Sequence, residues 1–310
     1  MGVASSALLD ALRGPGVTLT QDVDLALHTT LRVGGPADVL VTVDDEDALL
    51  HSVQIVVSHA VPMLVLGRGS NLLVGDAGWP GVVIRLGAGL RGISIEGTTV
   101  RCGGAEPMPS VAVRTAQAGL AGFAWGAAVP GSMGGGVRMN AGAHGADMSD
   151  ALVSARVLDP AVGRIEEWGP ERLALGYRHS ALPEAAIVTS VTLALTTADP
   201  ATVLAEIDAI RAWRREHQPL NRPSCGSVFT NPPGTSAGAL IDRVGLKGTR
   251  VGGAEVSGTH ANFIVTSPDA CASDVEQLIA LVARRVREET GIELSAEVVR
   301  PGPTPEGPRA

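Results

Sequence analysis

Residues 122–145 read GFAWGAAVPGSMGGGVRMNAGAHG, a run that matches no ordinary secondary structure. The run holds eight glycines, and its one charged side chain between Phe123 and His144 is that of Arg138. Dense glycine lowers the steric cost of left-handed backbone and lets the main chain approach a ligand closely. The run lacks a helical or strand period, yet it is too apolar for a solvated linker. We therefore expect a buried loop whose backbone N–H groups line a large, flat or anionic ligand. A compact structural loop is the alternative.

The composition limits the class of protein. The chain has 310 residues, 45% of them hydrophobic, which is enough for about two or three folding units. A net charge of −8 and only 3% aromatic residues argue against a nucleic-acid-binding face. The three cysteines are far apart and the seven histidines lack metal-ligand spacing, so we expect neither a disulfide scaffold nor a metal site. Without a signal peptide or a membrane-length apolar run, the sequence predicts a cytoplasmic protein with no membrane partner.

Periodicity and turn residues alternate between helix and strand along the chain, which predicts an α/β or α+β protein. Helices are expected over 7–13, 44–58, 109–118, 201–216, 236–244 and 273–290. The last of these would begin with a capping box at Ser273. Strands are expected over 36–43, 63–67, 151–158, 186–194 and 292–299, with a β-meander over 81–104. The final residues, 301–310, are predicted to be disordered.

A second glycine-rich turn, GRGSNLLV at 67–74, follows the strand predicted over 63–67. A glycine turn after a strand can cradle phosphate with its amide N–H groups. Leu72 stands where a dinucleotide fingerprint would have its third glycine, and no Walker A lysine follows. The turn is therefore either a phosphate cradle of another kind or an ordinary hairpin turn.

Polar side chains that could take part in chemistry lie in otherwise apolar, glycine-rich segments. Arg178 could grip a carboxylate in bidentate fashion, or it could be a surface arginine. Ser227 lies in a stretch stiffened by prolines, without the elbow of a hydrolase, so a structural serine is the alternative to a catalytic one. Glu297 lies within the predicted strand 292–299, either on its solvent face or buried with a partner. Asn231 is a further polar side chain in such a segment and a further candidate for the site.

Eight segments, taken in their order, resemble the UDP-N-acetylenolpyruvoylglucosamine reductases of peptidoglycan synthesis. They are TTLRVGGPAD (29–38), LGRGSNLLV (66–74), VPGSMGGGVRMNAGAHG (129–145), YRHS (177–180), GSVFTNP (226–232), AGALIDRVGLKG (237–248), GGAEVSGTHANFIV (252–265) and LSAEV (294–298). Each segment alone is modest evidence for the family, but the eight segments in this order are specific to it. The resemblance runs from about residue 20 to residue 300.

The resemblance implies an α+β protein with a FAD-binding fold of the vanillyl-alcohol oxidase type. Two lobes, 1–85 and 86–197, would bind FAD non-covalently, and a C-terminal domain, 198–310, would bind substrate. In such enzymes NADPH reduces FAD, hydride passes to C3 of the enolpyruvyl group of UDP-N-acetylglucosamine enolpyruvate, and a proton is added at C2 to give UDP-N-acetylmuramate. A monomer without nucleic-acid partners is expected.

The resemblance also implies roles for individual residues. Arg178 would grip the enolpyruvyl carboxylate, Ser227 would donate the proton, and Glu297 would help stabilise the enol-like intermediate. Substrate contacts would come from Tyr177, Asn231, His260 and Asn262. FAD would be held by Gly67, Arg68, Gly69, Ser70, Asn71, Leu72, Pro130, Gly131, Ser132, Gly134, Gly135, Asn140, Ala141 and Gly142.

The chain departs from the family pattern at one position. His217 precedes Gln218-Pro219, where many relatives carry a lysine that contacts the nucleotide diphosphate. The short stretch after Arg178 leaves no room for the extra substrate-covering loop of one subclass, so the shorter type is expected. Two other functions remain open: a flavin oxidase of the same fold with FAD tethered through His or Cys, and a non-catalytic flavin- or nucleotide-binding module.

Overall fold

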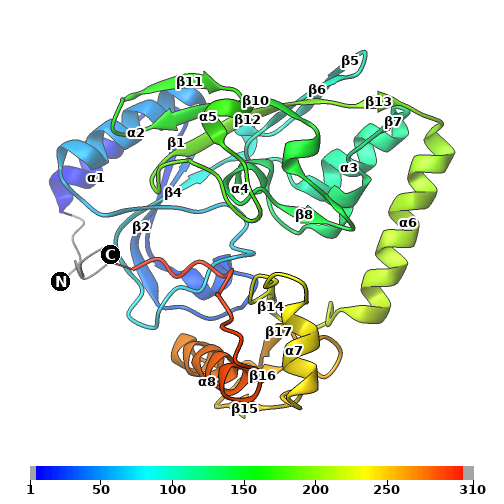
Figure 1. Ribbon diagram of the computed structural model, residues 1–310. Helices are drawn as coiled ribbons and strands as arrows, with labels where there is room; N and C mark the ends of the chain where they lie inside the picture. Colours follow the sequence, from blue (N-terminus) through cyan, green and yellow to red (C-terminus); the bar gives the residue numbers. More distant parts are fainter. Residues whose placement is uncertain (1–4, 303–310) are drawn as a thin grey trace.

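The computed structural model describes residues 5–302, and its three main β-sheets each carry their own helices (Figure 1). The first two sheets lie side by side in the upper part of Figure 1, and the third lies below them. No helix within residues 5–302 is long and apolar enough to cross a membrane. This mixture of parallel and antiparallel sheets with separate helices confirms the α+β class.

The first sheet has the strand order β1-β2-β4-β3. It consists of β1 (Val17–Asp24), β2 (Pro36–Val43), β3 (Met63–Val65) and β4 (Trp79–Leu86), with helices α1 (Ser6–Leu12) and α2 (Glu46–Ser58) packed beside it. Helix α2 begins at Asp45, whose carboxylate accepts a 2.7 Å hydrogen bond from the amide of Ala48. Its apolar stripe, including Leu49 and Val53, is buried against β2 and β4, which pair in parallel.

The second sheet is antiparallel, with the order β11-β10-β12-β6-β5. Its strands are β5 (Ile93–Glu96), β6 (Thr99–Gly103), β10 (Leu152–Asp159), β11 (Arg164–Trp168) and β12 (Ile187–Ala194). The same part of the chain contains helices α3 (Met108–Gln117), α4 (Met133–Arg138) and α5 (Pro170–Leu173). It also contains two short antiparallel strand pairs: β7 (Leu120–Ala121) pairs with β13 (Thr196–Thr197), and β8 (Gly142–Ala143) pairs with β9 (Ala146–Asp147). The long helix α6 (Pro200–His217) packs against α3 and then leads down to the third sheet (Figure 1).

The third sheet has the order β14-β17-β16-β15. It consists of β14 (Ser224–Ser227), β15 (Arg250–Val251), β16 (Ala254–Val256) and β17 (Phe263–Thr266), together with α7 (Ala237–Arg243) and α8 (Ala272–Thr290). Helix α8 buries Leu278, Val282 and Val286 in the core of this unit and ends at Gly291, whose φ of 73° suits only glycine well.

All six predicted helices are confirmed to within two residues at each end, but the capping box predicted at Ser273 for α8 is wrong. The helix begins at Ala272, with Cys271 rather than Ser273 at its N-cap. Asp76, from the loop after the second glycine turn, accepts hydrogen bonds from the amides of Ala272 (2.6 Å) and Ser273 (2.9 Å). A carboxylate from a distant loop therefore fixes the first turn, which local sequence does not reveal.

The strand predicted over 292–299 is also wrong. This segment forms only two isolated bridges, Ala296 with Phe229 and Val299 with Leu72. It alternates like a strand, but it pairs with one residue of the loop after β14 and one of the loop after β3, so no ladder develops. The tail predicted over 301–310 lies outside the described residues from 303 onward.

The β-meander predicted over 81–104 is wrong as well, because the segment is divided between two sheets. β4 joins the first sheet in parallel with β2 and β3, whereas β5 and β6 form a hairpin in the second sheet. The crossing occurs at Gly87 and Gly89, where an added Cβ would lie 2.2 Å and 2.1 Å from atoms of Asp44. Close packing of the crossover is what the glycines permit.

The run 122–145 is not the irregular loop that its composition predicts. It contains a short 3₁₀ helix (Ala124–Ala128), α4 and strand β8. The Ser132 hydroxyl caps α4 by accepting from the amide of Gly135. A Cβ on Gly136 would lie 2.8 Å from Met148 and 2.9 Å from Met108, so glycine lets this helix sit deep in the core. Three consecutive glycines obscured a helix that tertiary packing stabilises.

Candidate active site

A cavity of about 730 Å³ is lined by residues from the first two sheets and their loops. Its basic lining residues are Arg32, Arg68, Arg85, Arg91 and Arg138, and within the described chain no aspartate or glutamate lines it. Small-molecule sites usually have volumes of about 300–1,000 Å³. A cavity of this size and charge fits an anionic ligand.

The two glycine-rich stretches meet at this cavity. A Cβ on Gly67 would lie 2.9 Å from the Ser132 hydroxyl, and the Arg68 Nε donates a 2.7 Å hydrogen bond to the carbonyl of Pro130. Gly69 has a φ of 62°, and a Cβ there would lie 2.1 Å from the carbonyl oxygen of His28. Glycine thus lets the turn lie close to Ser132 and to the backbone of His28, which leaves its own main chain free to face a ligand.

The residue set fits FAD, the cofactor that the sequence resemblance implies. FAD carries a diphosphate, which the arginines and the exposed backbone suit, and a flat ring system, which a glycine-rich wall accommodates. His28 lies in the same lining, and its Nδ1 accepts a 3.2 Å hydrogen bond from the Arg85 guanidinium. Burial lowers the pKa of His28, and the Arg85 charge lowers it further, so the imidazole tends to stay neutral beside the arginine.

Five of the fourteen residues predicted to hold FAD line the cavity: Gly67, Arg68, Ser132, Gly134 and Gly135. The other nine are Gly69, Ser70, Asn71, Leu72, Pro130, Gly131, Asn140, Ala141 and Gly142, and they lie in the adjoining backbone without lining it. The sequence interpretation missed much of the wall, namely 27–30, Arg32, 85–88, Arg91, 104–105, Arg138 and 186–188. One signal was present in IRLGAGLRG (84–92), where arginines alternate with glycines after a strand.

Arg178 is a cation held by backbone carbonyls, and it does not line this cavity. Its backbone has a φ of 54°, an unusual conformation for a bulky residue that the tight turn between Gly176 and His179 maintains. The guanidinium Nη2 donates to the carbonyl of Gly142 at 2.8 Å. The Asn140 side chain supports the turn by donating to the carbonyl of Gly176 at 2.9 Å. The predicted cofactor residues Asn140 and Gly142 therefore hold Arg178 in place.

Glu297 pairs with Arg178 across the boundary between the second and third sheets. Its Oε1 lies 3.1 Å from the Arg178 Nε, and the two side chains are only 17% and 20% exposed. Burial raises the pKa of the Glu297 carboxyl above its ordinary value, and the Arg178 charge opposes that rise. The Glu297 amide donates to the carbonyl of Val228 at 2.7 Å, which places this acid beside the strand that carries Ser227.

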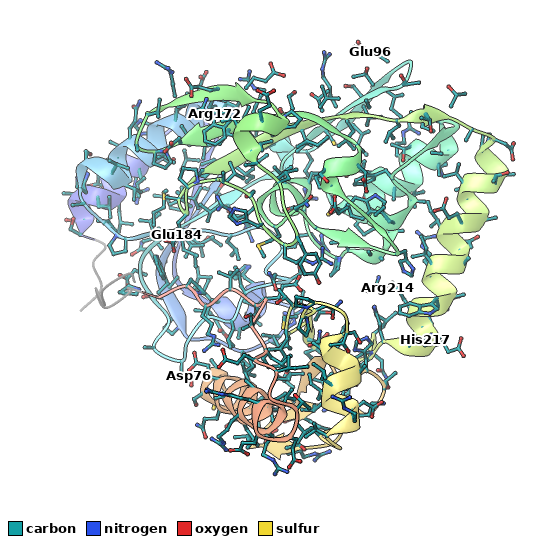
Figure 2. The ribbon with its side chains drawn as sticks, in the orientation of Figure 1. Asp76, Glu96, Arg172, Glu184, Arg214 and His217 are labelled. Atoms are coloured by element: carbon teal, nitrogen blue, oxygen red, sulfur yellow. The ribbon has the colours of Figure 1, made fainter. Side chains whose placement is uncertain are left out.

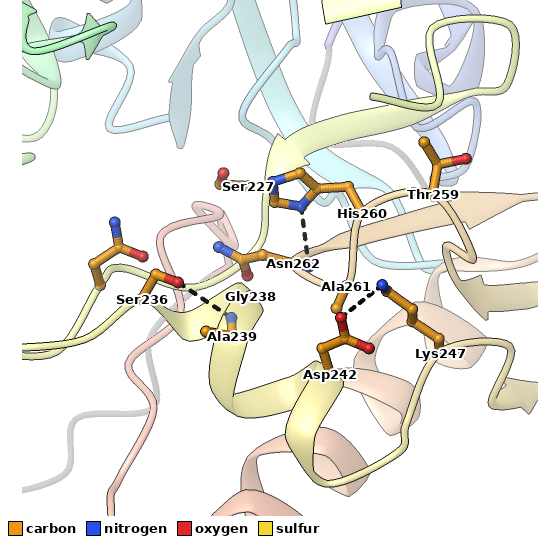
Figure 3. A pocket seen from close by; sticks show the side chains of 11 residues that line it. Ser227, Ser236, Gly238, Ala239, Asp242, Lys247, Thr259, His260, Ala261 and Asn262 are labelled. Atoms are coloured by element: carbon orange, nitrogen blue, oxygen red, sulfur yellow. Dashed lines mark hydrogen bonds and ion pairs between the residues drawn. The ribbon is translucent and has the colours of Figure 1, made fainter. Parts of the chain in front are cut away.

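Ser227 lies at the end of β14 and lines a second cavity of about 320 Å³, shown in Figure 3. The other lining residues are Asn231, Ser236, Gly238, Ala239, Asp242, Lys247, Thr259, His260, Ala261 and Asn262. Gly226, with a φ of 77°, interrupts the pairing of β14 with β17 just before Ser227. Arg178 and Glu297 do not line this cavity, and their link to Ser227 is the hydrogen bond from the Glu297 amide to the carbonyl of Val228, the residue after Ser227.

The predicted substrate-contact residues divide into two pairs. The Tyr177 hydroxyl accepts a 3.2 Å hydrogen bond from the Asn231 amide, which links the second unit to the third. Asn262 donates to the carbonyl of Phe229 at 2.8 Å and accepts from its amide at 3.0 Å, so its side chain fixes the backbone after Ser227. His260 lines the cavity (Figure 3). Burial, then Lys247 and His217, lower the pKa of His260.

His217, the departure from the family pattern, lies at the lower end of α6 with Arg214 (Figure 2). Its ring stacks on Trp213 with centroids 4.6 Å apart and planes 8° apart. The side chain is 45% exposed. Only the loop 179–186 separates Arg178 from β12, so no additional loop lies between these described elements.

Two family models match the chain. The model described as FAD binding domain matches residues 37–169, and the model described as UDP-N-acetylenolpyruvoylglucosamine reductase, C-terminal domain, matches residues 218–300. Among curated proteins, UDP-N-acetylenolpyruvoylglucosamine reductase 2 of Symbiobacterium thermophilum is 42% identical over 299 residues, covering 96% of each chain. The corresponding reductase of Bacillus subtilis is 41% identical over 276 residues, covering 88% of this chain and 91% of its own.

Solved structures agree with these matches. The crystal structure of UDP-N-acetylenolpyruvylglucosamine reductase from Thermus caldophilus superposes with a TM-score of 0.79 at 40% identity, covering 92% of this chain and 98% of its own. A variant of berberine bridge enzyme shares the fold over 61% of this chain, with a TM-score of 0.50 at 16% identity. The FAD-binding fold and both halves of the sequence resemblance are thereby confirmed.

Proposed function

The chain belongs to the UDP-N-acetylenolpyruvoylglucosamine reductase family, and we propose that Arg178, Ser227 and Glu297 carry out its chemistry. The enzyme uses NADPH and FAD to reduce UDP-N-acetylglucosamine enolpyruvate to UDP-N-acetylmuramate, a step of peptidoglycan synthesis. FAD, when bound, supplies the hydride chemistry. The three side chains supply orientation, charge stabilisation and the proton.

Arg178 is proposed to bind the carboxylate of the enolpyruvyl group. Reduction of a double bond conjugated to that carboxylate places negative charge on it. A cation already fixed by the carbonyl of Gly142 stabilises this charge without having to reorganise. The substrate carboxylate would then compete with Glu297 for the guanidinium.

Glu297 and Ser227 are proposed to handle the proton. Once the substrate carboxylate shares the Arg178 guanidinium, the opposing effect of that charge on Glu297 weakens, and burial, which favours the protonated form, dominates. A protonated carboxyl can donate a hydrogen bond to the developing enolate. Ser227, whose hydroxyl lies in the neighbouring cavity, is proposed to deliver the proton to C2.

The observation that carries this proposal is the Arg178–Glu297 ion pair, which is joined through Val228 to the Ser227 strand. The pair supplies a cation and an acid close to the strand that carries the Ser227 hydroxyl, which supports an enol ether reduction over a passive flavin-binding module. The direct test is to purify the protein, record its visible flavin spectrum and follow NADPH oxidation. Oxidation that continues through many turnovers only when UDP-N-acetylglucosamine enolpyruvate is added supports the proposal. A colourless protein, or NADPH oxidation indifferent to that substrate, would contradict it.

Glu297 should give the substrate-consuming step a characteristic pH dependence. Because its pKa is raised, the carboxyl keeps its donor proton to a higher pH than an ordinary glutamate. The rate of this step is expected to fall as pH rises through that pKa. Glu297→Gln retains an N–H donor but cannot titrate, so it should flatten this limb. Stopped-flow measurements with pre-reduced enzyme across pH would check it, and an unchanged limb in the glutamine variant would assign the titration to another group.

We also propose that the chain divides into lobes 1–85 and 86–197 and a substrate domain 198–310. Both lobes line the large cavity, and only the substrate domain lines the smaller one. A monomer in the cytoplasm, without nucleic-acid partners, is the simplest arrangement for an enzyme whose proposed catalytic residues all come from one chain.

A further inference from the structure

The second glycine turn, 67–74, contacts two different parts of the molecule. On one face Gly67 and Arg68 line the large basic cavity. On the other face the turn binds the segment that carries Glu297. The Asn71 side chain donates to the carbonyl of Glu297 at 3.1 Å, the Val299 amide donates to the carbonyl of Asn71 at 3.0 Å, and the Leu73 amide donates to the carbonyl of Val299 at 2.9 Å.

Glu297 depends on these contacts because it lies in no helix or strand. Its segment makes isolated bridges only, and Figure 1 shows it (red) running from the third unit alongside the first. The Glu297 peptide is held at both ends, its amide by the carbonyl of Val228 and its carbonyl by Asn71. The position of the carboxylate opposite Arg178 therefore depends on an amide from the cofactor turn.

The loop that follows the turn is anchored to the third unit by Asp76, which lies over the start of α8 in Figure 2. Burial alone would raise the pKa of Asp76, but the amides of Ser273 and Ala272 outweigh burial and lower it. The carboxylate thus stays charged where it caps α8. With the loop fixed at this end and at the Val299 bridge, Asn71 has a defined position.

We propose that Asn71 is a positioning residue for Glu297, and that it links the turn lining the cofactor cavity to the placement of that acid. FAD bound against Gly67 and Arg68 steadies the turn, and Asn71 transmits that order to the Glu297 peptide. The inference rests on the proposed function of Glu297. It assigns the Asn71 side chain to the substrate reaction rather than to contact with FAD.

The test compares Asn71→Ala and Asn71→Asp with wild type and with Thr230→Val as a matched control. Thr230 also donates from its side chain to a carbonyl of this segment, that of Ser295, but it does not reach the cofactor turn. Both Asn71 variants should bind FAD, and be reduced by NADPH, within about twofold of wild type. Their substrate-dependent reoxidation should slow by about 10- to 100-fold, the order that a misplacement of about 1 Å costs. Thr230→Val should stay close to wild type.

Hydrogen exchange supplies a readout independent of activity. In wild type and Thr230→Val, titration of the apoprotein with FAD should increase protection of the amides of Glu297 and Val299. In the Asn71 variants that increase should be lost. Asn71→Asp keeps the side-chain volume and carries the test if the alanine variant does not fold.

Two results would overturn the proposal. Loss of FAD binding in the variants would make Asn71 a cofactor contact, and unchanged reoxidation with unchanged protection would make the hydrogen bond irrelevant. Failure of the underlying function has a different signature. If Glu297→Ala turned over substrate normally, Glu297 would have no catalytic role, whereas the FAD-dependent protection and its loss on changing Asn71 would still be observed.

Discussion

Ser227→Ala is expected to remain yellow and reducible by NADPH while product formation falls by about 10²- to 10⁴-fold, the usual worth of a positioned proton donor. The side chain lies at the end of β14, held by the Asn262 clamp on Phe229. Removing one oxygen there leaves the fold and the flavin cavity untouched, because Ser227 does not line that cavity. Single-turnover mixing of reduced enzyme with substrate, followed by product analysis, measures the loss.

Ser224→Ala is the matched control for this change. Ser224 lies on the same strand but does not line the Ser227 cavity. It should keep turnover near the wild-type rate. Rapid product formation by Ser227→Ala would exclude this serine as the donor, and equal losses in both variants would point to a damaged strand.

Arg178→Met is expected to lower kcat/KM for the enolpyruvyl substrate by about 10²- to 10³-fold, or about 2.7–4 kcal/mol of transition-state stabilisation. The methionine retains much of the side-chain volume but removes the cation that pairs with Glu297 and is proposed to bind the substrate carboxylate. Because Arg178 opposes the upward shift in the pKa of Glu297, its loss should also move the pH limb of that acid to higher pH. Arg178→Lys keeps a positive charge without the planar guanidinium, so its kcat/KM should lie between those of the wild type and Arg178→Met.

Arg172→Met serves as the control for Arg178. Arg172 pairs with Glu166 and lies over the Trp168 ring in the same unit, away from both cavities. Steady-state kinetics of the variants, together with the rate of flavin reduction by NADPH, separates substrate binding from cofactor function. An Arg178→Met enzyme with normal kcat and KM would show that the carboxylate is bound elsewhere.

The sequence predicted the class of fold and the segments that matter, but it could not predict how they meet. Arg178, Ser227 and Glu297 are polar groups in apolar, glycine-rich surroundings, and this signal is local. For Arg85 and Arg91 the sequence offers only arginines alternating with glycines over 84–92, because their approach to the cavity depends on where the chain crosses from the first sheet to the second. The crossing is set by tertiary packing, and no short-range sequence pattern predicts it.

The errors share a physical cause. Strand periodicity in 292–299 reported side-chain alternation correctly, but a ladder also needs a continuous partner, and that segment has a different neighbour at each end. In 122–145 glycine suppressed the expected helix propensity, while contact with Met108 and Met148 supplied the missing stabilisation. The Asp76 cap on α8 joins residues 196 positions apart in the chain, so no local window of sequence could contain it.

Glu297 has a consequence for biosynthesis, because it follows nearly all of the other described residues in the chain. Domains generally fold in order as they leave the ribosome. A nascent polypeptide can therefore complete the basic cavity, and the strand bearing Ser227, before the acid that faces Arg178 has been translated. If Glu297 has its proposed role, the site stays incomplete until residues 294–299 have left the ribosome and packed beside Asn71, so activity should appear in one step rather than build up gradually.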